Sequence, residues 1–214
     1  TGCVLVNPNL QKASTNKVYI VCTKEQLDEN SSLMIFSLID KLSAELSVAK
    51  DIEQKKSLLM RRAIAHSVLC DFEAAISDFT YYISLDEKSS LAYWQRAVCQ
   101  AEMDEFNRTE GKGITNIHSA EADFSDAIRL NSNNAYIYYN RGNVHAGRNE
   151  LSKAIDDYSI AIRIDSRLAE AYYNRGLARI KSGNKQAGIQ DLSKAGELGL
   201  YDAYSVIKRI NKAK

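Results

Sequence analysis

Apolar and small residues recur along most of the chain at the spacing of amphipathic helices. From residue 56 onward they lie three and four positions apart, in stretches that end in polar breaks such as "LDEKSS", "LNSNN" and "IDSRL". This spacing places the apolar residues on one face of a helix, so the sequence predicts a series of short helices of about 14 residues each. A further amphipathic helix is expected over about 32–48.

The helical pattern also repeats with a longer period. An arginine followed by a small residue recurs after 34, 45 and 34 residues, at Arg62, Arg96, Arg141 and Arg175. A large residue repeats in the same register, at Phe79, Phe124, Tyr158 and Leu192, and four positions later come Ile83, Ile128, Ile162 and, as the exception, Gly196. One helix hairpin cannot bury its apolar face alone, whereas stacked hairpins can, so the period predicts a stack of helix–turn–helix units.

The register divides the chain into four units with different segments at each end. The expected units are 56–89, 90–134, 135–168 and 169–202, and the second carries 11 extra residues within 107–119. Residues 32–55 are expected to form a helix that packs on the first unit, and residues 203–214 a capping helix. Residues 1–31 are expected to form an extended arm with one strand in "KVYIVC", Lys17–Cys22. Because the chain begins with Thr1 rather than Met, we expect a fragment of a longer protein.

The repeated units resemble the tetratricopeptide repeat. The stretch "AEAYYNRGLARIKSGNKQAGIQDLSKAGELGL" carries Tyr172, Gly176 and Ala195 where this family has an aromatic residue, Gly and Ala. It departs from the family with Gly188 in place of Ala and Leu192 in place of an aromatic residue. The resemblance implies an all-α, right-handed solenoid of four repeats whose first helices line the concave face. In the family, that face binds peptides or proteins.

A narrower resemblance concerns the setting of the protein. The "KVYIVC" segment, the insertion in the second unit and the ending "DLSKAGELGLYDAYSVIKR" are similar to the C-terminal region of long tetratricopeptide proteins of Bacteroidetes. This similarity implies a bacterial cell envelope or periplasm, and the cytoplasm is the alternative.

Composition argues against several classes of function. The net charge of +1 provides no field that would attract nucleic acid. The four cysteines form no CxxC pair, and no metal or other cofactor is predicted. Cys70 and Cys99 are expected to be buried thiols, and a disulfide between Cys3 and Cys22 stays open. The three histidines form no nucleophile–base pattern, so no enzyme is predicted. No apolar run is long enough to insert in a membrane.

Charged residues recur at one position of each second helix. These residues are Asp78, Asp123, Asp157 and Asp191, each in register with one of the repeated arginines. The two sets could form an anion-binding groove, or they could form ion pairs within a unit or between neighbours. We favour structural ion pairs, because a ligand site seldom needs the same residues in every unit.

The candidate binding residues lie on the first helices. Large aromatic side chains that helix pairing does not require are typical of a partner footprint. The predicted set is Met60, Trp94, Val98, Tyr136, Tyr139, Asn140, Asn143, Tyr173, Asn174 and Leu177. Trp94, Tyr139 and Tyr173 are the expected anchors, and the three asparagines would bind a peptide backbone. The alternatives are ordinary packing between units and coverage by the N-terminal arm.

A carboxylate clamp for chaperone tails is not expected. The family's clamp needs Lys and Asn on one unit and Lys and Arg on another, and only Asn140 stands at a matching position. The sequence therefore predicts a non-catalytic scaffold for a protein or peptide partner. The alternative is a structural module of a larger cell-envelope protein that assembles with itself as a homodimer.

Overall fold

The computed structural model describes residues 28–109 and 117–212, and these residues form ten α-helices. The helices are α1 (Glu29–Val48), α2 (Ile52–Val68), α3 (Phe72–Leu85), α4 (Ser90–Thr109), α5 (Ile117–Leu130), α6 (Ala135–Gly147), α7 (Leu151–Ile164), α8 (Ala169–Lys181), α9 (Lys185–Glu197) and α10 (Asp202–Lys212). The predicted strand at 17–22 and the centre of the 107–119 insertion lie outside the described residues.

Capping side chains set where several helices begin. The carboxylate of Asp28 accepts a hydrogen bond from the backbone N–H of Ser31 at 2.7 Å, and Asp51 does the same for Gln54 at 2.8 Å. These caps satisfy backbone donors that the first turn of a helix leaves without a partner. They explain why α1 begins three residues, and α2 four residues, before the starts expected from apolar spacing.

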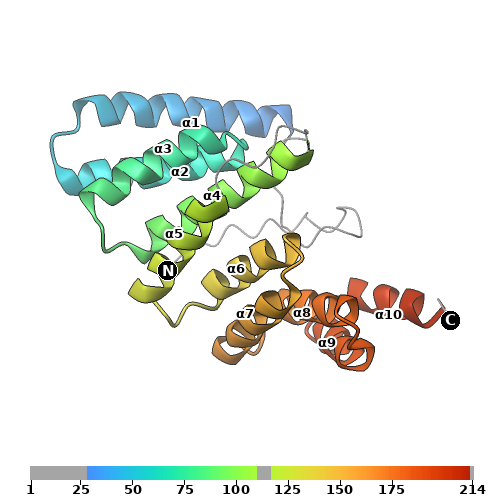
Figure 1. Ribbon diagram of the computed structural model, residues 1–214. Coiled ribbons are helices and arrows are strands. Elements are labelled where there is room, and N and C mark those ends of the chain that lie inside the picture. The colour runs from blue at the N-terminus through green and yellow to red at the C-terminus, as the bar shows by residue number, and fades with distance from the viewer. Residues whose placement is uncertain (1–27, 110–116, 213–214) are drawn as a thin grey trace.

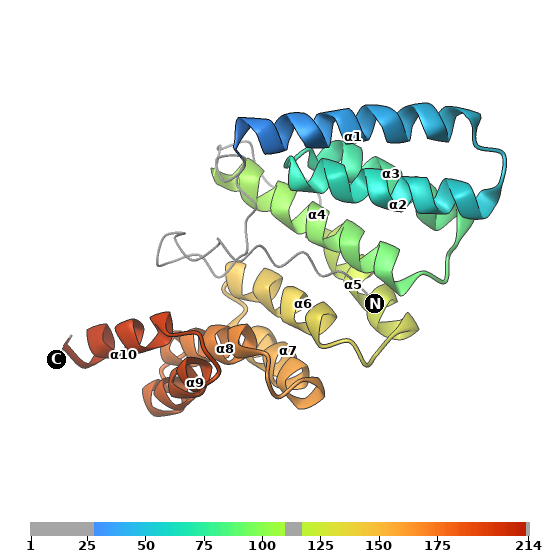
Figure 2. The same ribbon diagram turned by 180° about the vertical axis from the view of Figure 1, so that it is seen from behind.

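The helices pack as successive antiparallel pairs. In the sequence order, α2 packs with α3, α4 with α5, α6 with α7 and α8 with α9, and α3 and α7 also pack against the next first helix. Figures 1 and 2 show α2, α4 and α6 on one side of the molecule and α3, α5 and α7 on the other. The all-α, paired-helix architecture expected from the period is confirmed. We call each pair a unit below.

The core lies between the two helices of each unit. The repeated large residues Phe79, Phe124, Tyr158 and Leu192 are all fully buried. Small residues of the facing helix allow this close approach. A Cβ atom on Gly142 would lie 2.8 Å from Cε1 of Tyr158, and one on Gly188 would lie 2.6 Å from the backbone oxygen of Gly176. Gly188 therefore departs from the family's Ala because α8 and α9 nearly touch there.

The C-terminal helix α10 packs against α9. Its buried side is formed by Ala203 and Val206, whereas Tyr201 and Tyr204 are exposed. Ile207 and Ile210 pack against the same cluster as these two buried residues. Tyr204 instead lies over Gly196, since a Cβ atom there would be 2.5 Å from the tyrosine ring. This contact explains why a glycine interrupts the row of isoleucines.

Candidate binding surface on the first helices

Burial divides the predicted binding residues into two groups. Partly exposed side chains are those of Met60, Trp94, Val98, Tyr136, Asn140, Tyr173 and Leu177. Tyr139, Asn143 and Asn174 are buried, with 4–5% of each residue exposed. The expectation that these last three face a ligand is wrong for this structure, because their polar atoms are used inside the fold.

A polar network joins α6, α7 and α8. Nδ2 of Asn174 donates to Oη of Tyr139 at 3.1 Å and to Oδ1 of Asn143 at 3.0 Å. The same Oδ1 accepts a hydrogen bond from Oη of Tyr158 at 2.9 Å. The network links the first helices of two successive units, which contact each other directly. A buried network of this kind fixes the relative position of the helices, since an unmade bond would leave a buried polar group without a partner.

Tyr158 is the member of this network that sequence reasoning missed. The repeat register alone indicates only a large residue that fills space between helices at this position. A tyrosine at a position where two other units have phenylalanine was the available signal, because a buried tyrosine hydroxyl usually finds a hydrogen-bond partner. Its ring packs against that of Tyr139 with 6.0 Å between centroids, and burial raises the pKa of Tyr139 to about 12.

The exposed aromatic contact of the surface lies between α4 and α6. The rings of Trp94 and Tyr136 are stacked, with 6.4 Å between centroids and 26° between planes. Nε1 of Trp94 is buried and has no acceptor among the described residues. Val98 packs with Trp94 against the core cluster that contains Phe124. Asn140 lies one helical turn after Tyr136. These four residues form a continuous, partly exposed set, which we call the α4–α6 surface.

The other predicted residues lie apart from this surface. Met60 packs beside Phe79 in the core of the first unit. Tyr173 and Leu177 pack in the cluster of Leu192 and Val206, which the capping helix α10 completes. The structure therefore brings together only part of the predicted set. The reason is that α10 packs against Tyr173 and Leu177 at the end of the solenoid, whereas Met60 belongs to the core of the first unit.

The repeated arginines and aspartates meet in every unit. Nε and Nη2 of each arginine donate to the two carboxylate oxygens of one aspartate, at distances between 2.6 and 2.9 Å. The pairs are Arg62–Asp78, Arg96–Asp123, Arg141–Asp157 and Arg175–Asp191. The aspartates are buried, and the hydrogen bonds raise the pKa values of Arg62, Arg96 and Arg141. Because Nε and Nη2 of each guanidinium group already bind a carboxylate, this geometry favours structural ion pairs over an anion-binding groove. We call these ion pairs the arginine joints.

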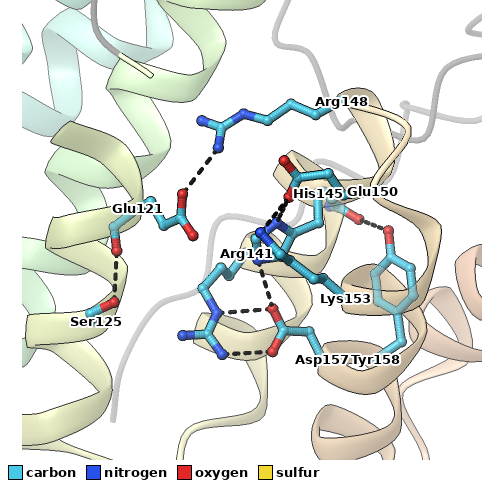
Figure 3. A network of polar contacts seen from close by, with 10 residues as sticks. Glu121, Ser125, Arg141, His145, Arg148, Glu150, Lys153, Asp157 and Tyr158 are labelled. Carbon is cyan, nitrogen blue, oxygen red and sulfur yellow. Dashed lines mark hydrogen bonds and ion pairs between the residues drawn. The ribbon is translucent and has the colours of Figure 1, made fainter. Parts of the chain in front are cut away.

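A third contact extends three of these pairs to the preceding helix. Nη1 of Arg62, Arg96 and Arg175 donates to the hydroxyls of Ser43, Thr80 and Ser159 respectively, at 3.0–3.1 Å. Ser125 holds the equivalent position for Arg141, but in the described part of the chain the two form no hydrogen bond. Arg148 instead donates to Glu121 at 3.2 Å across this junction (Figure 3). The junction between α5 and α6 is thus built differently from the others.

His145 lies inside the third unit beside its ion pair. Its Nδ1 is 2.8 Å from Oε2 of Glu150, and its Nε2 is 3.7 Å from Oδ2 of Asp157 (Figure 3). Glu150 also binds Lys153 at 3.0 Å, and these two partners lower the pKa of its carboxyl group. The imidazole is buried among charged groups that hold the unit together. The arrangement is that of a structural histidine, and the side chain of His118 lies outside the described residues.

Two further properties concern the described residues only. No group of three His, Cys, Asp or Glu side chains within 28–109 and 117–212 is arranged to hold a metal ion. None of the helices in this part of the chain is both long and apolar enough to cross a membrane.

Comparison with known sequences places tetratricopeptide repeats in the chain. The family described as TPR repeat matches residues 147–183, and the family described as tetratricopeptide repeat matches residues 169–198. Neither is an enzyme family. A comparison with curated proteins finds no match.

Several solved structures share the fold. MamA has a TM-score of 0.65 and 23% identity, and the alignment covers 83% of this chain and 98% of MamA. YrrB, described as a TPR protein with an unusual peptide-binding site, has a TM-score of 0.60 and 15% identity over 84% of this chain and 89% of YrrB. The first TPR domain of Spaghetti, bound to an HSP90 peptide, has a TM-score of 0.52 and 19% identity over 61% of this chain and 94% of that domain. The chain therefore folds as a tetratricopeptide-repeat solenoid.

Proposed function

We propose that this protein is a non-catalytic scaffold that binds a peptide or protein partner on the α4–α6 surface. The observation that carries the proposal is the partly exposed stack of Trp94 and Tyr136 between two successive first helices. Tryptophan and tyrosine supply large contact areas at little cost in side-chain entropy, and such residues dominate the binding energy of many interfaces.

The polar groups of the same surface fit an extended peptide. Asn140 can donate to and accept from a peptide backbone through one amide group. Asn143 and Asn174 are removed from the predicted readers, because they bind each other and Tyr139.

The known proteins with this fold support peptide binding as a class of function. YrrB is described with a peptide-binding site, and the Spaghetti domain is bound to an HSP90 peptide. For this chain we propose aromatic recognition rather than a carboxylate clamp, because the clamp positions hold other residues. A Bacteroidetes cell-envelope origin is part of the same proposal and rests on sequence resemblance.

The test is a peptide-array screen followed by titration of the peptides that bind. Trp94 is the single tryptophan of the chain, so its fluorescence reports on occupancy of the surface in the wild type, and the anisotropy of a fluorescently labelled peptide measures the affinity of every variant. Replacing both Trp94 and Tyr136 by Ala should weaken binding by about 30-fold or more, as expected for the loss of interface anchors. Tyr139 is not used in this test, because its replacement would disturb the buried network.

The matched control is Tyr81→Ala, which removes an exposed tyrosine from the second helix α3. Thermal unfolding establishes that each variant is folded before binding is compared. Unchanged affinity of the Trp94→Ala, Tyr136→Ala variant, or an equal loss in Tyr81→Ala, would refute the α4–α6 surface.

A further inference from the structure

The helix α1 packs on the first unit as second helices pack on the unit that follows them. Ser43 of α1 accepts a hydrogen bond from Nη1 of Arg62 at 3.0 Å. Thr80 of α3 accepts the equivalent bond from Arg96. Both hydroxyls lie on the helix that precedes the arginine, so Ser43 and Thr80 hold corresponding positions.

The neighbouring residues of α1 follow the same register. Leu42 directly precedes Ser43 and is 1% exposed, as Phe79 directly precedes Thr80 and is fully buried. Leu46 lies four residues after Leu42 and packs in the same cluster, as Ile83 lies four residues after Phe79. By position and by contact, α1 is the second helix of an additional unit.

The side of α1 that a first helix of its own would cover is exposed. Leu38 corresponds to Ala75, which is fully buried, yet Leu38 is 37% exposed. Lys41 corresponds to Asp78 and is also exposed. Met34 and Val48 lie on the same side of the helix, and each is 74% exposed. With the half-buried Glu45, these residues form a continuous line at helical spacing, which we call the α1 stripe.

The other end of the solenoid is finished differently. The outward residues of α10 include Lys208, Arg209 and Lys212, all exposed, so charge separates this end from further packing. On α1 the corresponding surface is mostly apolar. A stripe of large exposed apolar residues is typical of a contact with another polypeptide.

We propose that the α1 stripe is a self-association surface that binds the α1 helix of a second copy of this chain. The slot accepts an antiparallel helix, because the two helices of each unit are antiparallel. With a two-fold axis at the level of Ser43, Lys41 lies opposite the partner's Glu45, and Leu38 lies opposite the partner's Val48. Symmetry repeats both contacts, so the charges and the apolar side chains of the stripe are complementary to themselves.

The test measures association of the full chain by sedimentation velocity over a range of concentrations. Wild type should form a dimer. Lys41→Glu and Glu45→Lys each place like charges opposite one another and should weaken association by about tenfold or more. The double variant Lys41→Glu, Glu45→Lys restores opposite charges and should dimerise within about threefold of wild type. Leu38→Asn should also weaken association.

The matched control is Asp40→Lys, an exposed charge change on the same helix outside the stripe. Circular dichroism melting confirms that each variant is folded. A wild type that stays monomeric at high concentration overturns the proposal. In that case another segment of the chain or another protein covers the α1 stripe. A dimer that does not respond to the single charge reversals, or whose charge swap fails to restore association, overturns it as well.

Discussion

Nδ2 of Asn174 on α8 donates a 3.1 Å hydrogen bond to the hydroxyl of Tyr139 on α6, and both residues are buried. The bond joins the first helices of two successive units. It also turns two side chains expected to bind a ligand toward the interior of the solenoid.

Loss of the Asn174 amide should therefore destabilise the fold. Asn174→Ala removes the donor to Tyr139 and to Asn143 and should lower the free energy of unfolding by about 2 kcal/mol, because buried polar groups lose partners. Urea denaturation measures the effect. The matched control is Asn140→Ala, a partly exposed neighbour, for which a change below about 0.5 kcal/mol is expected. Equal effects in the two variants would contradict a special role for the network.

Stability should depend on Tyr139 at high pH. Burial raises the pKa of Tyr139 from its ordinary value of 10.0 to about 12. Between pH 10 and 12 the unfolded chain loses this proton while the folded chain keeps it, so the free energy of unfolding should fall as pH rises. Below pH 10 both states keep the proton, and Tyr139 contributes no pH dependence.

The corresponding measurement is urea denaturation at several pH values between 8 and 11. Tyr139→Phe should show a shallower fall above pH 10 than wild type. Identical slopes for the two proteins would mean that other tyrosines account for the whole dependence.

The third contact of the arginine joints can be tested with two serines. Ser159→Ala removes the acceptor of Nη1 of Arg175 and should cost about 1 kcal/mol of unfolding free energy relative to Ser125→Ala. Both serines lie two residues after the paired aspartate of a second helix, so the change in helix propensity is the same. Chemical denaturation of the two variants isolates the contact. The same loss in both would show that the contact does not stabilise the junction.

The ion pair itself should matter more than its third contact. Arg141→Ala leaves the carboxylate of Asp157 buried without its bidentate partner and should lower the free energy of unfolding by about 2–3 kcal/mol. The loss is smaller than for a fully buried ion pair, because Arg141 is itself partly exposed. Binding of a peptide to the α4–α6 surface should be unchanged in the folded protein. Melting temperature and titration measure these two effects separately. A variant as stable as wild type would contradict a structural role.

Gly188→Ala should destabilise the protein although alanine favours helices by about 1 kcal/mol. The added Cβ atom would lie 2.6 Å from the backbone oxygen of Gly176, so α8 and α9 would have to separate. We expect a net loss of about 1–3 kcal/mol in the free energy of unfolding, as for other overpacked cores. A stabilised variant would show that the two helices can move apart without cost.

Cys99 should not react with thiol reagents in the folded protein. It is 2% exposed, and burial raises the pKa of its thiol to about 12, so almost no thiolate is present at neutral pH. Alkylation followed by mass spectrometry of the peptides should show Cys70 modified before Cys99, because Cys70 is partly exposed. Denaturation should remove this difference. Rapid native labelling of Cys99 would contradict its burial.

The sequence alone determined the helical architecture and the register of the repeated arginines and aspartates, whereas the structure showed that they pair within a unit. Apolar residues at helical spacing indicate which face is buried whatever lies against it. The repeated offset between arginine and aspartate in three of the units is 16 residues, as for Arg62 and Asp78. The period also identified the arginines and aspartates as structural, because they recur in every unit, but it did not identify the buried network of Tyr139, Asn143 and Asn174.

Only the tertiary structure decided which of the remaining side chains stay exposed. Tyr136 and Tyr139 lie on the same helix and are indistinguishable by residue type, yet the first is partly exposed and the second is buried. Tyr139 is covered because α8 packs against α6, whereas α10 partly covers Tyr173 at the end of the solenoid. Exposure depends on how closely each neighbouring helix approaches, and contacts between distant parts of the chain set that distance.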